Sequence, residues 1–536
     1  MALSPAGNQV AFVASQGGIS QVYVRALDSP EAKPLPGTEG TYCTPIFSPD
    51  GQWLTFFVEG KLKKVSLQGG PPVTLANASG VNGVSWGSDD NIVFSDPSVG
   101  GLQKVPAAGG APQMITTVNS GKGEIAHKWP AHLPGGKALL FAVLKGGRPD
   151  EAEIVAQRLD TGERKVLVQG GTYPGYVPTG HLVFVRAGTL MAVPFSLERL
   201  ETTGAPAPVA ENVMQSGQGA AEFSLSPFGS LVYVPGGKRS NGTVPVWVDR
   251  KGVAGQPLSG FPANLYSWPQ ISLDGQRLTV NNGGAAGGDI WIYDIPRATL
   301  TRLTFDTKSN SPRWSPDGRW IAYSAIGPEG SANLFRRLAD GSGSEERLTK
   351  SKNAQQPSSW SPDGKLLAFQ ENHPSTGWDI WVLPLEGDRK PQPFLQTPFS
   401  ELMPVFSPDG RWIAYVSDES GREEVYARPY PGPGEKRQIS TEGGREPVWA
   451  RNGELFYRLG NKIMGVQVAT QPAFKAGAPR PFFEGPYFWF VYLPSFDVTA
   501  DGERFLMLKS TDPPATEISV VLNWFEELKK RVPAGR

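Results

Sequence analysis

One five-residue stretch matches the pattern that carries the nucleophile in many serine hydrolases. The segment Gly83-Val84-Ser85-Trp86-Gly87 has the form G-x-S-x-G. In those enzymes the serine lies on a sharp turn between a strand and a helix, where it can attack a carbonyl carbon. Here Ser85 falls in a short strand-like run, and no helical pattern follows it. We therefore interpret Ser85 as a strand residue and predict no catalytic residue.

Histidine and cysteine are the side chains that most often bind transition metals. The chain has one cysteine, Cys43, and four histidines, of which His127 and His132 are closest in sequence. Five positions apart on one strand, these two side chains point to opposite faces and cannot grip one ion. Cys43 has no second cysteine for a disulfide, and we expect a small buried thiol. We predict no metal and no cofactor.

Composition limits the partners. The 536 residues contain 51 Lys and Arg and 51 Asp and Glu, so the formal net charge is zero. A reader of nucleic acid or of an anionic membrane surface would be basic, and we expect neither partner. We expect no membrane span because no apolar run approaches the length that crosses a bilayer, and the first residues do not resemble a signal peptide.

The elements that must position any site are hairpins of one repeating type. In the clearest copy the turn Ser407-Pro408-Asp409-Gly410 joins a short strand to the alternating strand Trp412 to Val416. Proline presets the first corner of such a turn, Asp bonds its own backbone, and Gly accepts a positive φ. Turns of this type begin at residues 4, 48, 87, 133, 177, 226, 272, 315, 361, 407, 450 and 499, which lie 39 to 49 residues apart.

This period is typical of a four-stranded propeller blade. Twelve blades in one ring would leave a channel too wide for side chains to fill, whereas propellers usually have about four to eight blades. We therefore predict an all-β fold of two consecutive six-bladed propellers. The expected bounds are 1–258, with an incomplete N-terminal blade, 259–522, and a short tail at 523–536. Seven plus five blades is the alternative.

The turns followed by I-W-V strands resemble the repeats of TolB-type propellers, which are related to the WD-type repeats. Longer blocks resemble the extracytoplasmic propeller region of bacterial, especially acidobacterial, membrane-bound serine/threonine protein kinases. These blocks are His127-Lys128-Trp129-Pro130, Thr376 to Leu385, Trp412 to Glu419 and Val520-Val521-Leu522-Asn523-Trp524. The resemblance implies a periplasmic or extracytoplasmic sensor or interaction surface.

Kinase activity itself is not implied. The chain lacks the Gly-rich phosphate loop with its strand lysine, the H-R-D catalytic loop and the D-F-G motif. We expect a non-catalytic module that binds a protein, a peptide or a small ligand. It would be the sensory portion of a receptor-type kinase. The alternative is the accessory propeller of a prolyl-oligopeptidase-like peptidase or of another propeller hydrolase.

A ligand would dock where loops converge at one mouth of a channel. The residues just before each inner strand collect there, and their mixture of polar and aromatic types suits a peptide or protein. We expect Trp314, Trp360 and Trp449 to be wedges between blades instead. The candidate ligand-binding residues are Tyr266, Trp268, Asn310, Gln355, Glu401, Arg445 and Glu446 in the second ring, and His127 and Trp129 in the first.

Overall fold

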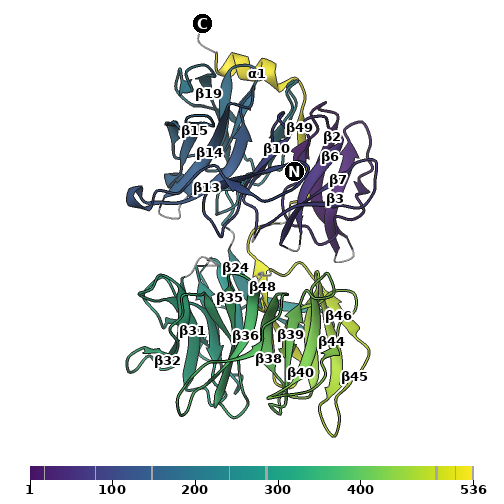
Figure 1. Ribbon diagram of the computed structural model, residues 1–536, viewed down its shortest axis with the longest axis vertical. Helices are drawn as coiled ribbons and strands as arrows, with labels where there is room; N and C mark the ends of the chain where they lie inside the picture. The colour runs from purple at the N-terminus through teal and green to yellow at the C-terminus, as the bar shows by residue number, and fades with distance from the viewer. Residues whose placement is uncertain are drawn as a thin grey trace. The chain divides into compact units, whose positions relative to one another are not determined.

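The chain forms two compact units, Met1–Ser240 with Pro513–Arg536 and Asn241–Asp512. The computed structural model describes residues 1–16, 19–58, 60–78, 80–145, 149–240, 242–262, 264–283, 288–488, 493–513 and 515–533. Each unit contains six antiparallel sheets built from these residues (Figure 1). The fold is that of a double β-propeller, as the repeat predicts, and we number the sheets as blades 1 to 12 in the order of their turns.

The first propeller consists of blades 1 to 6 and ends with a helix. Its elements are β1 (Ala2–Leu3), β2 (Gln9–Gln16), β3 (Ile19–Ala26) and β4 (Lys33–Pro34); β5 (Ile46–Phe47), β6 (Trp53–Val58), β7 (Lys61–Ser66) and β8 (Val73–Asn77); β9 (Val84–Trp86), β10 (Asn91–Ser95), β11 (Leu102–Pro106) and β12 (Gln113–Met114); β13 (Glu124–His132), β14 (Ala138–Lys145), β15 (Glu153–Arg158) and β16 (Arg164–Gln169); β17 (Thr172–Val177), β18 (His181–Arg186), β19 (Thr189–Ser196), β20 (Glu201–Thr202) and β21 (Ala207–Ala210); β22 (Phe223–Leu225), β23 (Leu231–Tyr233) and β49 (Ser519–Val521); and α1 (Trp524–Arg531).

The second propeller consists of blades 7 to 12. Its strands are β26 (Tyr266–Ile271), β27 (Arg277–Asn282), β28 (Asp289–Asp294) and β29 (Thr299–Arg302); β30 (Asn310–Trp314), β31 (Trp320–Ile326), β32 (Ala332–Leu338) and β33 (Glu346–Arg347); β34 (Gln355–Trp360), β35 (Leu366–His373), β36 (Gly377–Pro384) and β37 (Gln392–Leu395); β38 (Glu401–Phe406), β39 (Trp412–Ser417), β40 (Glu424–Pro429) and β41 (Arg437–Gln438); β42 (Arg445–Trp449), β43 (Glu454–Leu459), β44 (Lys462–Ala469), β45 (Lys475–Ala476) and β46 (Arg480–Glu484); and β47 (Asp497–Val498), β48 (Arg504–Ser510), β24 (Thr243–Asp249) and β25 (Ala254–Pro257).

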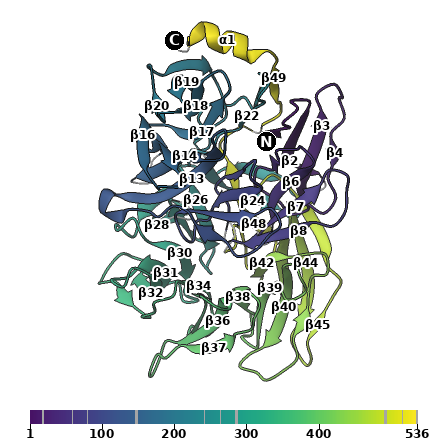
Figure 2. The same ribbon diagram turned by 45° about the horizontal axis from the view of Figure 1, so that its top comes forward.

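Both rings close with strands from distant parts of the chain. In blade 12, β24 pairs with β48 from Thr243↔Ser510 to Asp249↔Arg504 (Figure 2). In blade 6, β49 pairs with β23. The bounds therefore differ from the expected 1–258, 259–522 and 523–536, because a closed ring needs a last sheet shared between its two chain ends. Blade 1, expected to be incomplete, has four strands, whereas blade 6 has three in the described residues and blades 5 and 11 have five.

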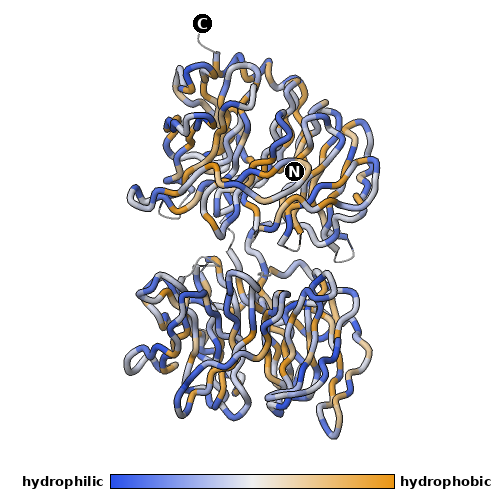
Figure 3. The backbone as a smooth tube through the Cα atoms, viewed as in Figure 1, coloured by the Kyte–Doolittle hydropathy of each residue, from blue (hydrophilic) through white to orange (hydrophobic). Residues whose placement is uncertain are grey.

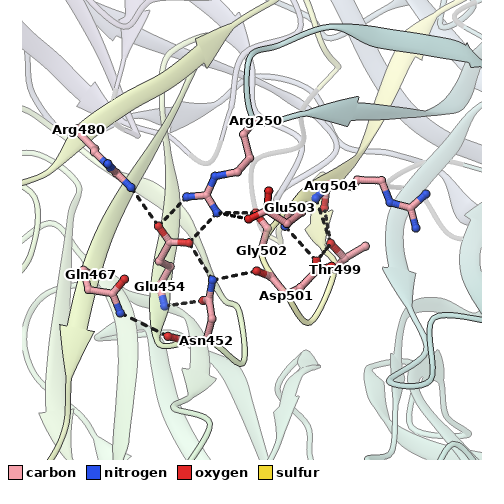
Figure 4. Close-up of polar contacts among 10 residues, drawn as sticks. All are labelled: Arg250, Asn452, Glu454, Gln467, Arg480, Thr499, Asp501, Gly502, Glu503 and Arg504. Carbon is pink, nitrogen blue, oxygen red and sulfur yellow. Dashed lines mark hydrogen bonds and ion pairs between the residues drawn. The ribbon is translucent and has the colours of Figure 1, made fainter.

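A network of polar contacts around Arg250 joins the two halves of blade 12 to blade 11 (Figure 4). Arg250 follows β24, and its two Nη atoms donate to Glu454 on β43 over 2.9 and 2.7 Å. The same guanidinium donates to the backbone oxygen of Gly502, in the turn before β48. Two parallel hydrogen bonds from one guanidinium to one carboxylate are stronger than hydrogen bonds between neutral groups. This contact stabilises the closure of the second ring.

The recurring turn owes its residues to backbone bonds. The Ser407 hydroxyl donates to Asp409 over 2.6 Å and accepts the N–H of Trp412. Asp409 also accepts the N–H of Arg411, and Gly410 has a φ of 72°, which suits glycine. The repeated aspartates are therefore parts of the scaffold, as the sequence indicates.

Hydrophobic residues lie mainly along the strands, and hydrophilic residues gather at the turns (Figure 3). The described residues fall into separate apolar clusters, such as that around Leu402, Val425 and Leu455. Among the described residues, one α-helix occurs, α1, with eight residues. No helix in this part of the chain has the length and apolar character to cross a membrane.

Candidate functional site

The inner strands of the second propeller surround a cavity of about 220 Å³. Each blade contributes the residue two positions before its turn, and we call this set the channel ring. It consists of Gln270, Arg313, Ser359, Val405, Val448 and Asp497. The wall also includes Trp314, Trp360 and Trp449. These tryptophans pack between blades as predicted, but they also border the cavity, which the sequence did not indicate.

Side chains of the channel ring tie neighbouring blades together. Gln270 accepts the N–H of Trp314 in the next blade, and Ser359 accepts the N–H of Phe406 over 3.2 Å. Asp497 accepts the N–H of Ile271 over 2.7 Å, which links the last blade to the first. A side chain at this position therefore spans the gap between two inner strands.

Arg313 and Asp497 give the ring one charge of each sign. Arg313 is 4% exposed, and its Nε donates to the backbone oxygen of Ser358 over 2.8 Å while Nη1 donates to that of Pro312 over 3.2 Å. Its Nη2 has no hydrogen-bond partner among the residues that the structure describes. One face of the guanidinium therefore remains available to a ligand.

Burial perturbs both charges. It lowers the pKa of Arg313 to about 10, a shift that the charge of Asp497 opposes. It raises the pKa of the Asp497 carboxyl to about 6, although the N–H groups of Ile271 and Val498 lower it. Within the described ranges, no ion pair within 4.0 Å joins the two groups. Two buried charges that form no ion pair with each other favour a ligand that neutralises them.

The ligand-binding residues predicted from the sequence for a channel mouth lie at the start of the inner strands. In the second propeller, none of them lines the channel cavity. Asn310 and Arg445 are partly exposed. The buried members are Tyr266, Trp268, Gln355, Glu401 and Glu446 in the second propeller and His127 and Trp129 in the first. Their role in ligand binding stays a prediction.

Several of these buried residues have structural partners. Glu446 pairs with Arg458 over 3.2 Å and accepts the N–H of Ser495 over 3.0 Å. In the first propeller, His127 contacts Thr116 through Nδ1 over 2.7 Å and Glu124 through Nε2 over 3.1 Å. These bonds hold the inner strands in place.

A bulge lies just before the channel ring, and three of the predicted mouth residues, Trp129, Trp268 and Glu446, are part of it. In six blades a proline stands three residues before the turn, and the residue before this proline has a positive φ. The pairing register between the two inner strands shifts at the same place. The residues are Trp129, Tyr173, Trp268, Ser311, Met403 and Glu446. Positive φ is uncommon for such side chains and is often a sign of function. Because it recurs around both rings, it is part of the scaffold here.

Ser85 of the G-x-S-x-G motif lies in β9, which pairs with β10, so no helix follows it. Its Oγ accepts the backbone N–H of His132 over 3.0 Å and lies 2.8 Å from Nδ1 of the same residue. Ser224 and Ser359 occupy the same position in their blades and accept equivalent N–H groups. Ser85 therefore joins two blades, in agreement with its interpretation as a strand residue.

Sequence reasoning missed Arg313 and Asp497. The signal was present, because both stand two residues before a recurring turn. The bulge one to three residues earlier breaks the period-two alternation, so the face of the strand could not be deduced from the pattern.

Comparison with known proteins identifies a stretch of the chain that is similar to a β-propeller family. Residues 311–473 match the model of the TolB beta propeller domain. An uncharacterized protein of Agrobacterium fabrum is 28% identical over 182 residues, which are 33% of this chain. The chain spans 58% of the length of that relative.

Solved structures with similar folds include TolB proteins and peptidases. A putative TolB from Agrobacterium tumefaciens is 17% identical, with 51% of this chain and 99% of that chain covered and a TM-score of 0.42. TolB from Acinetobacter baumannii is 13% identical, with 73% and 82% covered and a TM-score of 0.33. A prolyl endopeptidase is 10% identical, with 72% and 50% covered and a TM-score of 0.31. Across residues 311–473, the second propeller is therefore similar to the TolB beta propeller domain.

Proposed function

We propose that this chain is a non-catalytic binding module, and that the channel of its second propeller receives part of a protein or peptide. The observation that carries the proposal is the channel ring, in which Arg313 and Asp497 face one cavity without pairing to each other. The aromatic wall and the guanidinium are residue types that dominate binding energy at protein interfaces.

The size of the cavity limits what enters it. About 220 Å³ is below the range of pockets that enclose drug-sized ligands, which begin at about 300 Å³. A single side chain or a chain end fits this space better than a whole small molecule does. The rest of the partner would then lie on the surrounding turns.

Peptide binding by the full chain tests this proposal. A panel of short peptides is titrated while the fluorescence of Trp314, Trp360 and Trp449 is recorded, because these residues border the cavity. Peptides that bind the wild type should bind the Arg313→Met and Asp497→Asn variants at least tenfold more weakly. Lys251→Met, at an exposed turn, is the matched control. Equal binding by all variants, or cleavage of the peptides, would contradict the proposal.

We infer a sensory role from the sequence blocks that resemble receptor-type serine/threonine kinases, with the propellers on the periplasmic side. The DNA upstream of the Met1 codon tests this inference directly. An in-frame kinase domain followed by a membrane span is the expected result, and a different coding sequence would overturn the inference without affecting the channel proposal.

A further inference from the structure

A second cavity, of about 510 Å³, lies between blades 9 and 10 of the second propeller, away from the channel ring. Strand β37 of blade 9 contributes one residue, strands β38 to β40 of blade 10 contribute four, and the segments that flank these strands contribute the rest. We call it the inter-blade pocket. Its lining residues are Leu395, Thr397, Glu401, Tyr415, Ser417, Glu419, Arg428, Gly434, Glu435 and Lys436.

Glu401 brings an unsatisfied carboxylate oxygen into this pocket. It is the first residue of β38 and is only 2% exposed. Oε1 accepts the hydroxyl of Thr397, whereas Oε2 has no hydrogen-bond partner among the described residues. A buried acceptor without a donor is costly, and a charged one more so.

A second buried carboxylate, whose charge acts on Glu401, also has an oxygen without a hydrogen-bond partner among the described residues. Asp379, on β36 of blade 9, is fully buried, and its Oδ1 lacks a partner within the described residues. Its Oδ2 accepts the hydroxyl of Thr376 over 2.8 Å. Asp418, just after β39, accepts the N–H of Ser400. Burial first, and then the charges of Asp379 and Asp418, raise the pKa of Glu401 to about 7.

The cations in the pocket wall do not neutralise this group. Lys436 is bound to the carboxylate of Glu419. Arg428 pairs in register with Ile413, whereas Glu401 pairs with Ser417. Four residues of strand separate these positions by about 13 Å, which exceeds the reach of an arginine side chain. None of the three acids forms an ion pair within 4.0 Å in the described part of the chain.

We propose that the inter-blade pocket binds a cationic amine, with the free oxygen of Glu401 as the acceptor for its ammonium group. An ammonium carries several N–H donors on one compact charge, which suits the free oxygen of Glu401 and the negative field of Asp379 and Asp418. The described residues hold no group of three His, Cys, Asp or Glu side chains arranged for a metal ion. Tyr415 provides an aromatic wall for the cation.

The amine can belong to a free molecule or to a lysine side chain, and calorimetric titration of the full chain distinguishes these sources. The probes are putrescine and Nα-acetyl-lysine N-methylamide at pH 8, with CaCl₂ as a third titrant. At least one amine should bind, and Glu401→Gln should weaken this binding at least tenfold. Asp379→Asn removes a charge that acts on Glu401 and should weaken the binding by a smaller factor. The control Glu386→Gln changes an exposed carboxylate on blade 9, and this variant should bind the amine like the wild type.

Proton release provides a second readout. Because the bound ammonium stabilises the charged form of Glu401, binding near pH 7 should release a proton that the Glu401→Gln variant does not release. Three outcomes would overturn the proposal: no heat with either amine, equal affinity in the Glu401→Gln variant, or binding of Ca²⁺ in place of the amines. The channel proposal is unaffected by any of them, since the peptides that test it bind at Arg313 and Asp497.

Discussion

The two propellers use the same repeat but line their channels differently. In the second propeller the channel ring includes an arginine, an aspartate and a glutamine. The equivalent register positions of the first propeller, two residues before each turn, are Ala2, Ile46, Ser85, Ala131, Gly175 and Ser224. These are small or apolar residues without charge. The turns and bulges are therefore scaffold, and the ring is where the two units diverge.

The rings also close differently. The first uses one late strand, β49, followed by helix α1, whereas the second shares blade 12 between β24–β25 and β47–β48. Closure by a long-range pair costs loop entropy, which the contacts at the seam must offset. Changes at each seam should therefore affect one propeller and spare the other.

The largest expected effect is that of Trp524→Ala. Trp524 is 2% exposed and packs with Leu190 and Val213 of the first propeller. Its truncation should cost about 3–5 kcal/mol of unfolding free energy. Differential scanning calorimetry should show a lower transition for the first propeller alone. The control is Leu522→Ala, which changes a side chain that is 64% exposed. A shift of the second propeller as well would break the comparison.

Arg250→Met should have the next largest effect, now on the second propeller. It leaves the nearly buried carboxylate of Glu454 without its main partner, at a cost of about 2–4 kcal/mol. Arg250 holds the pKa of Glu454 below its usual value. This contribution is present above the unfolded pKa and is lost as pH falls, so the variant should differ from the wild type more at pH 7 than at pH 3. Equal differences at both pH values would contradict this assignment.

Much of the fold could be predicted because the turns are local. Ser, Pro, Asp and Gly at one spacing specify a hairpin wherever they occur, and the period then counts the blades. Ring closure could not be predicted in this way. The pairing of residues 243–249 with 504–510 joins segments far apart in sequence, and no local pattern indicates which strand completes which sheet.

The channel ring could not be predicted from the sequence for a different reason. The predicted mouth residues, such as Tyr266, were chosen by their place near the start of the strand, but the bulge at Trp268 and Pro269 lies between Tyr266 and the ring. Arg313 and Asp497 come to line the same cavity only when the inner strands of six blades converge. Glu401 was predicted as a mouth residue, which stays a prediction, and the structure shows that it lines the inter-blade pocket.

Asp497→Asn should sharpen the contrast between the rings through pH. The folded pKa of Asp497 is about 6 and its usual value is 3.8. Because the folded state holds the proton more tightly, stability falls as pH rises from about 4 to 6, by about 1–3 kcal/mol. The variant should lose this decline in the unfolding transition of the second propeller. The first propeller has Ser224 at the corresponding position in its closing blade and should show no such change.

The smallest expected effect is that of Ser85→Ala. It removes one hydrogen bond to the N–H of His132 and should cost about 0.5–1.5 kcal/mol. Ser359→Ala in the second ring should cost a similar amount. Denaturant titration of both variants measures the two costs. Hydrolysis of an ester by the wild type that Ser85→Ala abolishes would show that the two rings differ in chemistry as well.

The most direct measurement is site-specific photo-crosslinking of a bound peptide from the two rings. A photoreactive residue replaces Val405 in the second ring or Ala131 at the equivalent position of the first, with the chain otherwise intact. We predict that the peptide is crosslinked from position 405 and not from position 131. Crosslinking from position 131 alone, or from neither position while the peptide remains bound, would contradict the assignment of the second channel as the binding site.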